Sequence, residues 1–239
     1  MSLSIVLTCC NEVPMIFETY LMLSGLMKAT CVDHEFIVVD DGSTAEVQKA
    51  LVEFFRGYGI MVILSDRNEG RGAAVTKGIR AGTKEYVGFI DTDLEIPAHS
   101  LLVLHHIAVA FDADMVIAER VYRWNLHPGH LIRNLGSVIL RFVSSTMLEL
   151  NNLDTETGAK VFRRRAIIDV LDDVLSKRWF WDTEIIAEAL KRAQRVVEVP
   201  VVVTRRSDKT STVRPLKDTC KYLMAMVEYR RRRRFNSLY

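Results

Sequence analysis

The chain has 239 residues, of which 49% are hydrophobic and 26% are charged. This composition is typical of a globular protein and excludes disordered, collagen-like and fibrous chains. A chain of this length buries about 70% of its unfolded surface, so it needs neither disulfides nor a structural metal to hold a core. The formal net charge is only +2, and we therefore expect no nucleic-acid partner.

The cysteines and the apolar segments indicate the compartment. Cys9 and Cys10 are adjacent, while Cys31 and Cys220 show no metal-binding spacing. These positions favour a reduced, cytoplasmic chain over a disulfide framework. No apolar stretch approaches the roughly 20 residues that a membrane-spanning helix requires. The N-terminal apolar run follows no basic segment, which argues against a signal peptide.

The first half of the chain alternates short apolar runs with helical patterns. Runs rich in valine and isoleucine predict buried strands at Ser4–Thr8, Glu35–Val39, Ile60–Leu64, Tyr86–Ile90, Met115–Ala118 and Val196–Val203. The segments between the first five runs predict helices at about Val13–Ala29, Thr44–Arg56, Arg71–Gly82 and Pro97–Phe111. This alternation predicts an α/β fold with a mostly parallel sheet and helices on both faces. Ligands of such sheets bind beyond the carboxyl ends of the strands.

The second half contains two long amphipathic patterns. The first covers Leu131–Leu150, and the second covers Pro215–Tyr229 and leads into five arginines, Arg230–Arg234. No linker rich in proline, glycine or serine marks a domain boundary. We therefore expect one catalytic domain over residues 1–204. Residues 205–239 would form an appendage made of a basic loop, an amphipathic helix and an arginine-rich tail.

Two acidic clusters directly follow predicted strands. One is DDGS at residues 40–43, where carboxylates can accept hydrogen bonds from a base or a ribose. The other is DTD at residues 91–93, with Glu95 two residues further on. In an extended segment Asp91, Asp93 and Glu95 would share one side, and their oxygens suit Mg²⁺ or Mn²⁺ with a substrate diphosphate. Each cluster alone also fits a solvated turn or a helix cap.

Four motifs in a fixed order resemble those of the inverting GT-A glycosyltransferases of family 2. They are Asn11-Glu12 after the first predicted strand, VDDGS at residues 39–43, NEGRG at residues 68–72 and FIDTD at residues 89–93. The resemblance covers about residues 4–210. It implies a Rossmann-like GT-A sheet flanked by helices, and a nucleotide-sugar donor.

The resemblance also implies roles for the matching residues. The nucleotide-sugar would contact Thr8, Asn11, Glu12, Asp40, Gly70, Arg71, Asp91 and Thr92. The metal ligands would be Asp91, Asp93 and Glu95, with Asp93 essential because a bound metal stabilises the charge of the leaving diphosphate. The first loop departs from the family pattern, since Thr8 and Cys10 replace the more common proline and aromatic or arginine residues.

The later motifs resemble those of polyprenyl-phosphate hexose synthases, including dolichyl-phosphate mannose synthases. The matching residues are Arg120, then Arg133, Ser137 and Arg141 on the amphipathic pattern, then DTETGAKVF at residues 154–162. The resemblance implies that Arg120, Arg133 and Ser137 bind the lipid phosphate. Arg133 and Ser137 are four residues apart, so one helical face could present both to the same phosphate. The alternative is a packed helix with its arginines in solvent.

Two further segments bear on the acceptor. The basic stretch at residues 205–211 resembles the family's flexible loop, with Arg206 and Lys209 as its phosphate-binding side chains, although it also fits an ordinary surface loop. A hydroxyl acceptor would instead need a general base. Asp154 is the first candidate for that base and Asp182 the second, and either residue could cap a helix instead.

The sequence thus predicts a metal-dependent hexosyltransferase that moves a hexose from a UDP- or GDP-sugar to a polyprenyl phosphate. A phosphate acceptor is already anionic, so it needs positioning and charge neutralisation more than deprotonation. We expect a peripheral enzyme on the inner face of the membrane, where the arginine run attracts anionic lipids. The alternatives are a soluble hydroxyl acceptor, a nucleotidyltransferase and a catalytically silent membrane-binding protein. Self-association stays open.

Overall fold

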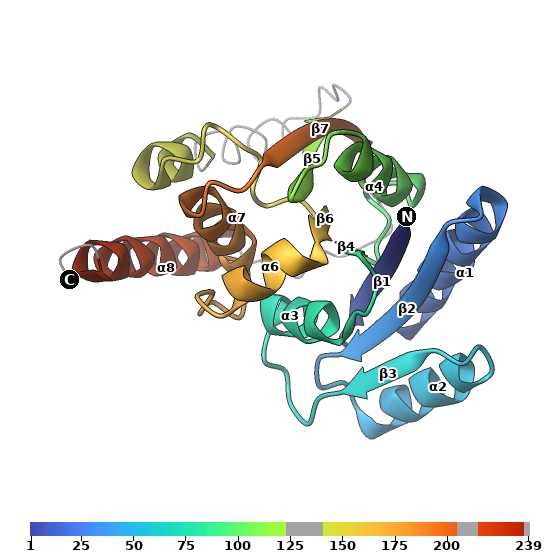
Figure 1. The fold of residues 1–239 in the computed structure, drawn as a ribbon. Helices are drawn as coiled ribbons and strands as arrows, with labels where there is room; N and C mark the ends of the chain where they lie inside the picture. The colour runs from blue at the N-terminus through green and yellow to red at the C-terminus, as the bar shows by residue number, and fades with distance from the viewer. Residues whose placement is uncertain (123–140, 205–214, 237–239) are drawn as a thin grey trace.

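The computed structural model describes residues 1–122, 141–204 and 215–236 of the chain. Its centre is one seven-stranded sheet (Figure 1). The strands are β1 (Ser2–Cys9), β2 (Asp33–Asp40), β3 (Met61–Leu64), β4 (Tyr86–Ile90), β5 (Met115–Tyr122), β6 (Ala159–Arg163) and β7 (Val196–Val203). They lie in the order β3-β2-β1-β4-β6-β5-β7. Only β6 runs against its neighbours β4 and β5, and the other adjacent strands are parallel.

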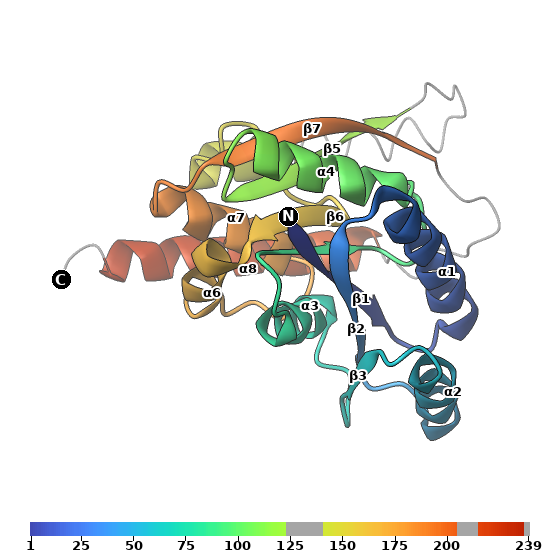
Figure 2. The ribbon, with the colours of Figure 1, turned by 45° about the vertical axis from the view of Figure 1, so that its right-hand side comes forward.

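Helices cover both faces of the sheet (Figures 1 and 2). They are α1 (Val13–Thr30), α2 (Ala45–Arg56), α3 (Arg71–Ala81), α4 (His99–Ala110), α6 (Arg164–Leu171), α7 (Trp181–Lys191) and α8 (Pro215–Asn236). Residues of α1, α2 and α4 form the core on one face, and residues of α3, α6 and α7 form the core on the other. Alternate residues of β1 supply the two layers, because Leu7 packs into the first core and Val6 into the second.

A third cluster joins α8 to the rest of the molecule. Tyr222, Met226 and Tyr229 of α8 are buried against Phe180 and Leu148. The Tyr222 hydroxyl lies 2.6 Å from the hydroxyl of Thr183 in α7, and the Tyr229 hydroxyl donates to Glu188 at 2.8 Å. The helix that follows the sheet is therefore docked on α7 through both apolar and polar contacts. Within the described residues, no helix combines the length and the apolar character needed to span a bilayer.

The structure confirms the six predicted strands and the four predicted helices of the first half, to within two or three residues at most ends. It adds β6, which the sequence pattern did not predict because the buried Lys160 and Arg163 interrupt its apolar residues. It also adds α6 and α7. Residues 141–148 of the predicted amphipathic pattern are helical, and the earlier part of that pattern lies outside the described residues.

A glycine in α3 allows this helix to lie directly on the sheet, and its replacement tests the packing. A Cβ atom at Gly78 would lie 2.2 Å from Cγ1 of Val6, whereas a Cβ atom at Gly25 in α1 would meet nothing within 4 Å. We predict that Gly78→Ala lowers the free energy of unfolding by about 1–3 kcal/mol through overpacking. Gly25→Ala should raise it by about 0.5–1 kcal/mol because alanine favours a helix. Urea unfolding measures both, and equal effects would contradict this packing.

Candidate active site

Polar side chains gather at one edge of the sheet, where the parallel strands β1, β2, β4 and β5 end and the antiparallel strand β6 begins. This is the edge at which ligands of such sheets bind. Acidic residues follow β2 and β4 directly, and another precedes β6. The structure thus brings together the clusters that the sequence placed after separate strands.

The loop after β1 is tied to the loop after β2. The Asn11 backbone N–H donates to the Ser43 hydroxyl at 2.8 Å, and the Asn11 side-chain oxygen accepts from the Thr44 N–H at 3.0 Å. Asn11 has φ +59°, in the left-handed region that asparagine tolerates. Thr8, near the end of β1, and Glu12, just before α1, are both half-buried. The two loops therefore form one wall at this edge of the sheet.

Asp40 is buried and its carboxylate is occupied by the protein itself. It accepts hydrogen bonds from the Ser43 N–H at 3.0 Å and from the Gln48 amide at 2.8 Å, and it also bonds the Ser43 hydroxyl. Gly42 lies in the same loop with φ +74°, and a Cβ atom there would lie 2.2 Å from the Arg67 carbonyl carbon. In this arrangement Asp40 shapes the loop after β2.

Asp41 has a positioning role that the sequence pattern did not reveal. Its two carboxylate oxygens accept from the backbone N–H groups of Glu69 at 2.8 Å and Gly70 at 2.9 Å. Gly70 has φ +113°, and a Cβ atom there would lie 2.5 Å from the Lys177 carbonyl oxygen. Asp41 therefore holds the glycine loop at the start of α3. Its place in the acidic cluster was visible in the sequence, but its partners follow only from the fold.

The segment after β4 turns, so the extended conformation predicted for Asp91, Asp93 and Glu95 is wrong. Thr92 and Asp93 lie in a turn, and Leu94 has φ +54°. The buried Thr92 carbonyl accepts from the Thr19 hydroxyl at 2.8 Å. The Asp93 carboxylate accepts from the Glu95 N–H at 3.1 Å. The turn spans Asp91–Leu94, and the Leu94 N–H donates to the Asp91 carbonyl at 3.4 Å.

Four charged side chains form a continuous network that we call the charge chain, made of Asp91, Arg71, Asp182 and Lys160. Arg71 donates to Asp91 Oδ1 from Nε at 2.8 Å, and its Nη2 lies 2.7 Å from the same oxygen. Its Nη1 donates to Asp182 Oδ2 at 2.5 Å. Lys160 Nζ donates to the other oxygen, Asp182 Oδ1, at 2.6 Å. Negative and positive groups alternate along the chain, which lets the charges be buried.

The charge chain is packed against a ring and leaves Asp91 partly open. Arg71 and Lys160 lie over the face of Phe89, at 5.0 and 5.4 Å from its centroid. Burial lowers the pKa of Lys160, and Asp182 opposes that change. Burial raises the pKa of Asp91, with Arg71 opposing and Asp93 adding to the effect. The Asp91 side chain keeps 35% of its surface exposed, whereas Asp182 is buried with both oxygens engaged.

Two glycines allow this close packing. Gly158 precedes β6, and its carbonyl accepts from the Asp91 N–H at 2.8 Å. A Cβ atom at Gly158 would lie 2.1 Å from Asp91 Oδ2. At the other end, a Cβ atom at Gly72 would lie 2.4 Å from Cβ of Trp181. Any side chain at either position would push apart elements that the charge chain connects.

Arg120 and Asp154 form a second buried pair at the end of β5. Arg120 donates to Asp154 Oδ2 from its backbone N–H at 3.0 Å and from Nε at 2.8 Å, and to Oδ1 from Nη2 at 2.7 Å. Burial acts to raise the pKa of Asp154, but the hydrogen bonds and charge of Arg120 outweigh it and lower the pKa. Glu156 lies 3.8 Å from Arg120, is 31% exposed at its side chain, and has a pKa raised by burial.

The carboxylates at the end of β4 could supply some, but not all, of the ligands of a divalent cation. Among the described residues, no group of three or more histidine, cysteine or acidic side chains is close enough to hold a metal ion. The predicted three-carboxylate set that includes Glu95 is therefore not assembled. Asp91 and Asp93 still supply hard oxygen donors, and Asp91 Oδ2 lies outside its pair with Arg71. Mg²⁺ commonly uses one or two carboxylates and completes its shell with substrate phosphates.

The predicted acceptor site falls only partly within the described residues. Arg133, Ser137, Arg206 and Lys209 lie outside the described residues. Arg120 lies at the sheet edge, where its guanidinium is engaged by Asp154. Arg141, which the sequence placed on the same amphipathic pattern, donates to the Asn152 carbonyl at 2.7 Å. Arg120 and Arg141 thus both bind the segment that precedes β6, through Asp154 and Asn152.

Comparisons with known proteins bear on the family and the fold. The sequence matches the family described as Glycosyl transferase family 2 over residues 4–171. It is 28% identical over 173 residues to Glycosyltransferase AglD of Haloferax volcanii, covering 70% of this chain and 27% of that protein. It is 29% identical over 181 residues to Dolichyl-phosphate beta-glucosyltransferase ALG5C of Trichomonas vaginalis, covering 70% and 52%. The chain thus spans about half of these relatives or less.

The fold also matches solved structures. Mannosyl-3-phosphoglycerate synthase from Rubrobacter xylanophilus superposes with a TM-score of 0.72 at 17% identity. The match covers 99% of this chain and 75% of that one. At this identity the likeness shows the fold alone.

The pair of Arg120 and Asp154 predicts a pH-dependent stability. Arg120 lowers the pKa of Asp154, so the pair stabilises the fold above the ordinary aspartate pKa of about 4 and loses this effect as the pH falls through the lowered value. We predict that Arg120→Met costs about 3 kcal/mol near pH 7, because it leaves a buried carboxylate unpaired. The unpaired Asp154 takes up a proton more readily, so the cost shrinks as the pH falls toward about 4.

Urea unfolding of wild type and variant at several pH values measures this change. The double variant Arg120→Met/Asp154→Asn is the control, since it removes both charges and its cost should not vary with pH in this range. A cost of Arg120→Met that stays constant between about pH 7 and pH 4.5 would contradict the assignment.

Proposed function

We propose that the chain, which belongs to glycosyl transferase family 2, moves a hexose from a UDP- or GDP-sugar to a polyprenyl phosphate with inversion. The observation that carries this proposal is the pair of carboxylates Asp91 and Asp93 at the end of β4, with Asp91 oriented by the charge chain. The relative from Trichomonas vaginalis, a dolichyl-phosphate beta-glucosyltransferase by name, supports the lipid phosphate as acceptor.

The donor would lie along the wall made by the loops after β1 and β2. Thr8, Asn11 and Glu12 border the space for the nucleoside, and Asp40 contributes by holding its loop rather than through a free oxygen. The Gly70 loop, fixed by Asp41, would bring Arg71 and backbone N–H groups near the diphosphate. Thr92 keeps the turn after β4 anchored on α1.

Asp91 and Asp93 would hold Mg²⁺ or Mn²⁺ together with the donor's phosphate oxygens. A divalent cation there supplies charge neutralisation to the leaving nucleoside diphosphate. The chain's own contribution is to hold Asp91 in place. Arg71 fixes one of its oxygens, and Gly158 keeps the start of β6 in contact with the other. The carboxylates therefore need little reorganisation when the donor binds.

The state of the two proposed bases favours a phosphate acceptor. Asp154 has a lowered pKa and is held by Arg120, and Asp182 has both oxygens engaged in the charge chain. Neither is arranged to remove a proton from a hydroxyl group. An anionic phosphate needs no such step and would be neutralised by arginine and lysine side chains. Arg133, Ser137, Arg206 and Lys209 remain the proposed phosphate ligands, with Arg120 ordering the wall beside them.

A second candidate is transfer to a hydroxyl group of a soluble acceptor. Glu156 favours it, because this side chain is partly exposed beside Arg120 and its pKa is raised by burial. A carboxylate with a raised pKa is a better general base than Asp154. Loss of turnover in Glu156→Gln without loss of donor binding would support this candidate.

The arginines at the end of α8 suit a peripheral place on the inner face of a membrane. Arg231 and Arg234 are exposed, and basic residues close to anionic headgroups each contribute about 1 kcal/mol of attraction. This attraction would keep the enzyme at the surface in which a polyprenyl phosphate is anchored.

Asp93→Asn tests the proposed metal ligand. We predict that this variant folds normally and that its transfer rate falls by about 100-fold or more. The reason is that the divalent cation, which would stabilise the leaving diphosphate, is no longer held. Binding of Mn²⁺ with the nucleoside diphosphate should weaken in parallel. Asp169→Asn, an exposed acid on α6, is the matched control and should retain activity. Full activity of Asp93→Asn would remove Asp93 from the mechanism.

The function itself is tested by transfer from radiolabelled UDP- and GDP-hexoses to undecaprenyl or dolichyl phosphate in detergent with Mg²⁺ or Mn²⁺. We predict label in the organic extract with one donor class, and none when the cation is chelated. Nucleotide release without labelled lipid would move the assignment to a soluble acceptor. Absence of turnover with every donor would contradict the proposal.

A further inference from the structure

The loop between α6 and α7, residues 172–180, exposes large apolar side chains beside basic ones. Leu175 is 61% exposed and Trp179 is 55% exposed. Between them lie Lys177 and Arg178, both of which are also exposed. Tryptophan combines a large apolar ring with a polar N–H, which suits the boundary between water and lipid. Lysine and arginine beside it can reach anionic headgroups with their charged ends.

This loop is held in place at the rim of the candidate active site. The Lys177 carbonyl accepts from the Ala73 N–H at 3.0 Å, next to the Gly70 loop. The Ser176 N–H donates to Glu184 at 2.8 Å. Beyond Trp179, the buried Trp181 donates from its indole N–H to Thr76 at 2.9 Å. These contacts fix the backbone that carries Trp179 beside the Gly70 loop.

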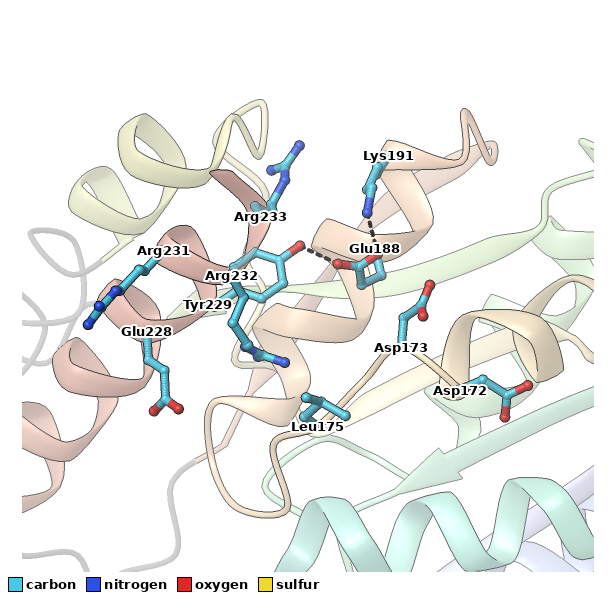
Figure 3. A pocket seen from close by; sticks show the side chains of 10 residues that line it. All are labelled: Asp172, Asp173, Leu175, Glu188, Lys191, Glu228, Tyr229, Arg231, Arg232 and Arg233. Atoms are coloured by element: carbon cyan, nitrogen blue, oxygen red, sulfur yellow. Dashed lines mark hydrogen bonds and ion pairs between the residues drawn. The ribbon is translucent and has the colours of Figure 1, made fainter. Parts of the chain in front are cut away.

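Helix α8 belongs to the same surface as the loop. Glu184 is fully buried and also accepts from Arg232 of α8 at 2.7 Å, so one carboxylate ties both segments to α7. A cavity of about 510 Å³ opens between them, with Leu175 on one side and Tyr229, Arg231 and Arg233 on the other. Figure 3 shows Tyr229 and Arg232 directed toward α7 and the loop that carries Leu175, whereas Arg231 and Arg233 extend away from that loop.

The exposed face of α8 also combines apolar and basic side chains. Met224 is 63% exposed and Val227 is also exposed. They precede the exposed Arg231 by seven and four residues, a spacing that places all three along one side of a helix. An exposed apolar stretch that leads into arginines is typical of a helix lying in a membrane interface.

The acidic residues near the cavity are largely neutralised within the protein. Asp172 pairs with Arg80 at 2.6 Å, and Asp173 pairs with Arg192. Glu188 accepts from Tyr229 and lies 3.6 Å from Lys191. Glu228 is an exposed acid on α8 beside the cavity. Lys177 also pairs with Glu69 at 3.5 Å, so Arg178, Arg231 and Arg233 supply the excess of positive charge toward an anionic partner.

We propose that loop 172–180 and the exposed side of α8 form one lipid-facing surface, with Trp179 and Met224 entering the headgroup region of an anionic bilayer. The surface borders the Gly70 loop, so docking would bring the donor site to the level of the lipid phosphates. This last consequence rests on the proposed function, whereas the docking itself does not. Charge complementarity and the exposed tryptophan select a lipid surface as the partner.

Vesicle binding tests the surface in the 239-residue chain. With vesicles of phosphatidylcholine and phosphatidylglycerol, we expect Trp179→Ser and Met224→Ser each to lower the partition coefficient by about tenfold, because each removes apolar area from the interface. Phe111→Ser is the matched control, since Phe111 is 54% exposed at the end of α4, outside the surface, and its loss should leave partitioning unchanged. Circular dichroism verifies that each variant folds.

Tryptophan quenching locates the contact directly. The chain contains three tryptophans, Trp124, Trp179 and the buried Trp181. In Trp124→Phe, lipids brominated on their acyl chains should quench the fluorescence, and the added change Trp179→Phe should remove that quenching. Quenching that persists without Trp179, or partitioning that Trp179→Ser does not change, would overturn the proposal. The proposal would also be overturned if the wild type self-associated and Trp179→Ser did not, because the surface would then bind a second copy of the chain.

The docking and the enzymatic proposal can fail separately. Vesicle binding is measured without donor, so its loss in Trp179→Ser supports the lipid-facing surface even if no sugar is transferred to lipid. Transfer in detergent does not need a bilayer. An active enzyme that does not bind vesicles would therefore contradict the lipid-facing surface and leave the proposed function intact.

Discussion

The alternating charges from Lys160 to Asp91 connect four parts of the chain that meet at one edge of the sheet, with Asp91 directly after β4. Arg71 comes from the start of α3, Asp182 from the start of α7 and Lys160 from β6. Each buried charge is compensated by the next, so removing one member leaves its neighbour unpaired. The position of Asp91 therefore depends on contacts that reach 111 residues along the sequence. Gly72 and Gly158 allow these segments to pack closely, because a side chain at either position would push the connected segments apart.

The charge chain and the Arg120–Asp154 pair together limit the chemistry that this edge of the sheet can perform. Asp154 is held ionised by Arg120, and Asp182 has both oxygens engaged by Arg71 and Lys160, so neither is arranged as a base. Asp91 stays partly exposed beside Asp93, an arrangement suited to binding phosphate-bearing groups through a cation, while the partly exposed Glu156 is the group that a hydroxyl acceptor would use. An acceptor that is already charged fits such a site. The loop that bears Trp179 and the docked helix α8 would bring that acceptor's membrane to the same rim.

Much of this was predictable from the sequence, for identifiable reasons. Strongly apolar runs specify β1, β2 and β4, and the acidic residues that follow them fall at one edge because parallel strands end together. Strand β6 could not be predicted, because its Lys160 is buried only by virtue of a partner in α7. The turn at Asp93 depends on the left-handed conformation of Leu94, which no local pattern announces. Asp182 resembled a base in sequence, and only its contacts identify it as a positioning residue.

The most direct test of the account is a crystal structure with a UDP- or GDP-sugar and Mn²⁺, with the metal located by its anomalous scattering. We predict an anomalous peak in contact with the Asp93 carboxylate and the donor's diphosphate, with Arg71 still bound to both Asp91 and Asp182. Donor bound at another edge of the sheet, or at this edge with no metal near Asp91 and Asp93, would contradict the central claim.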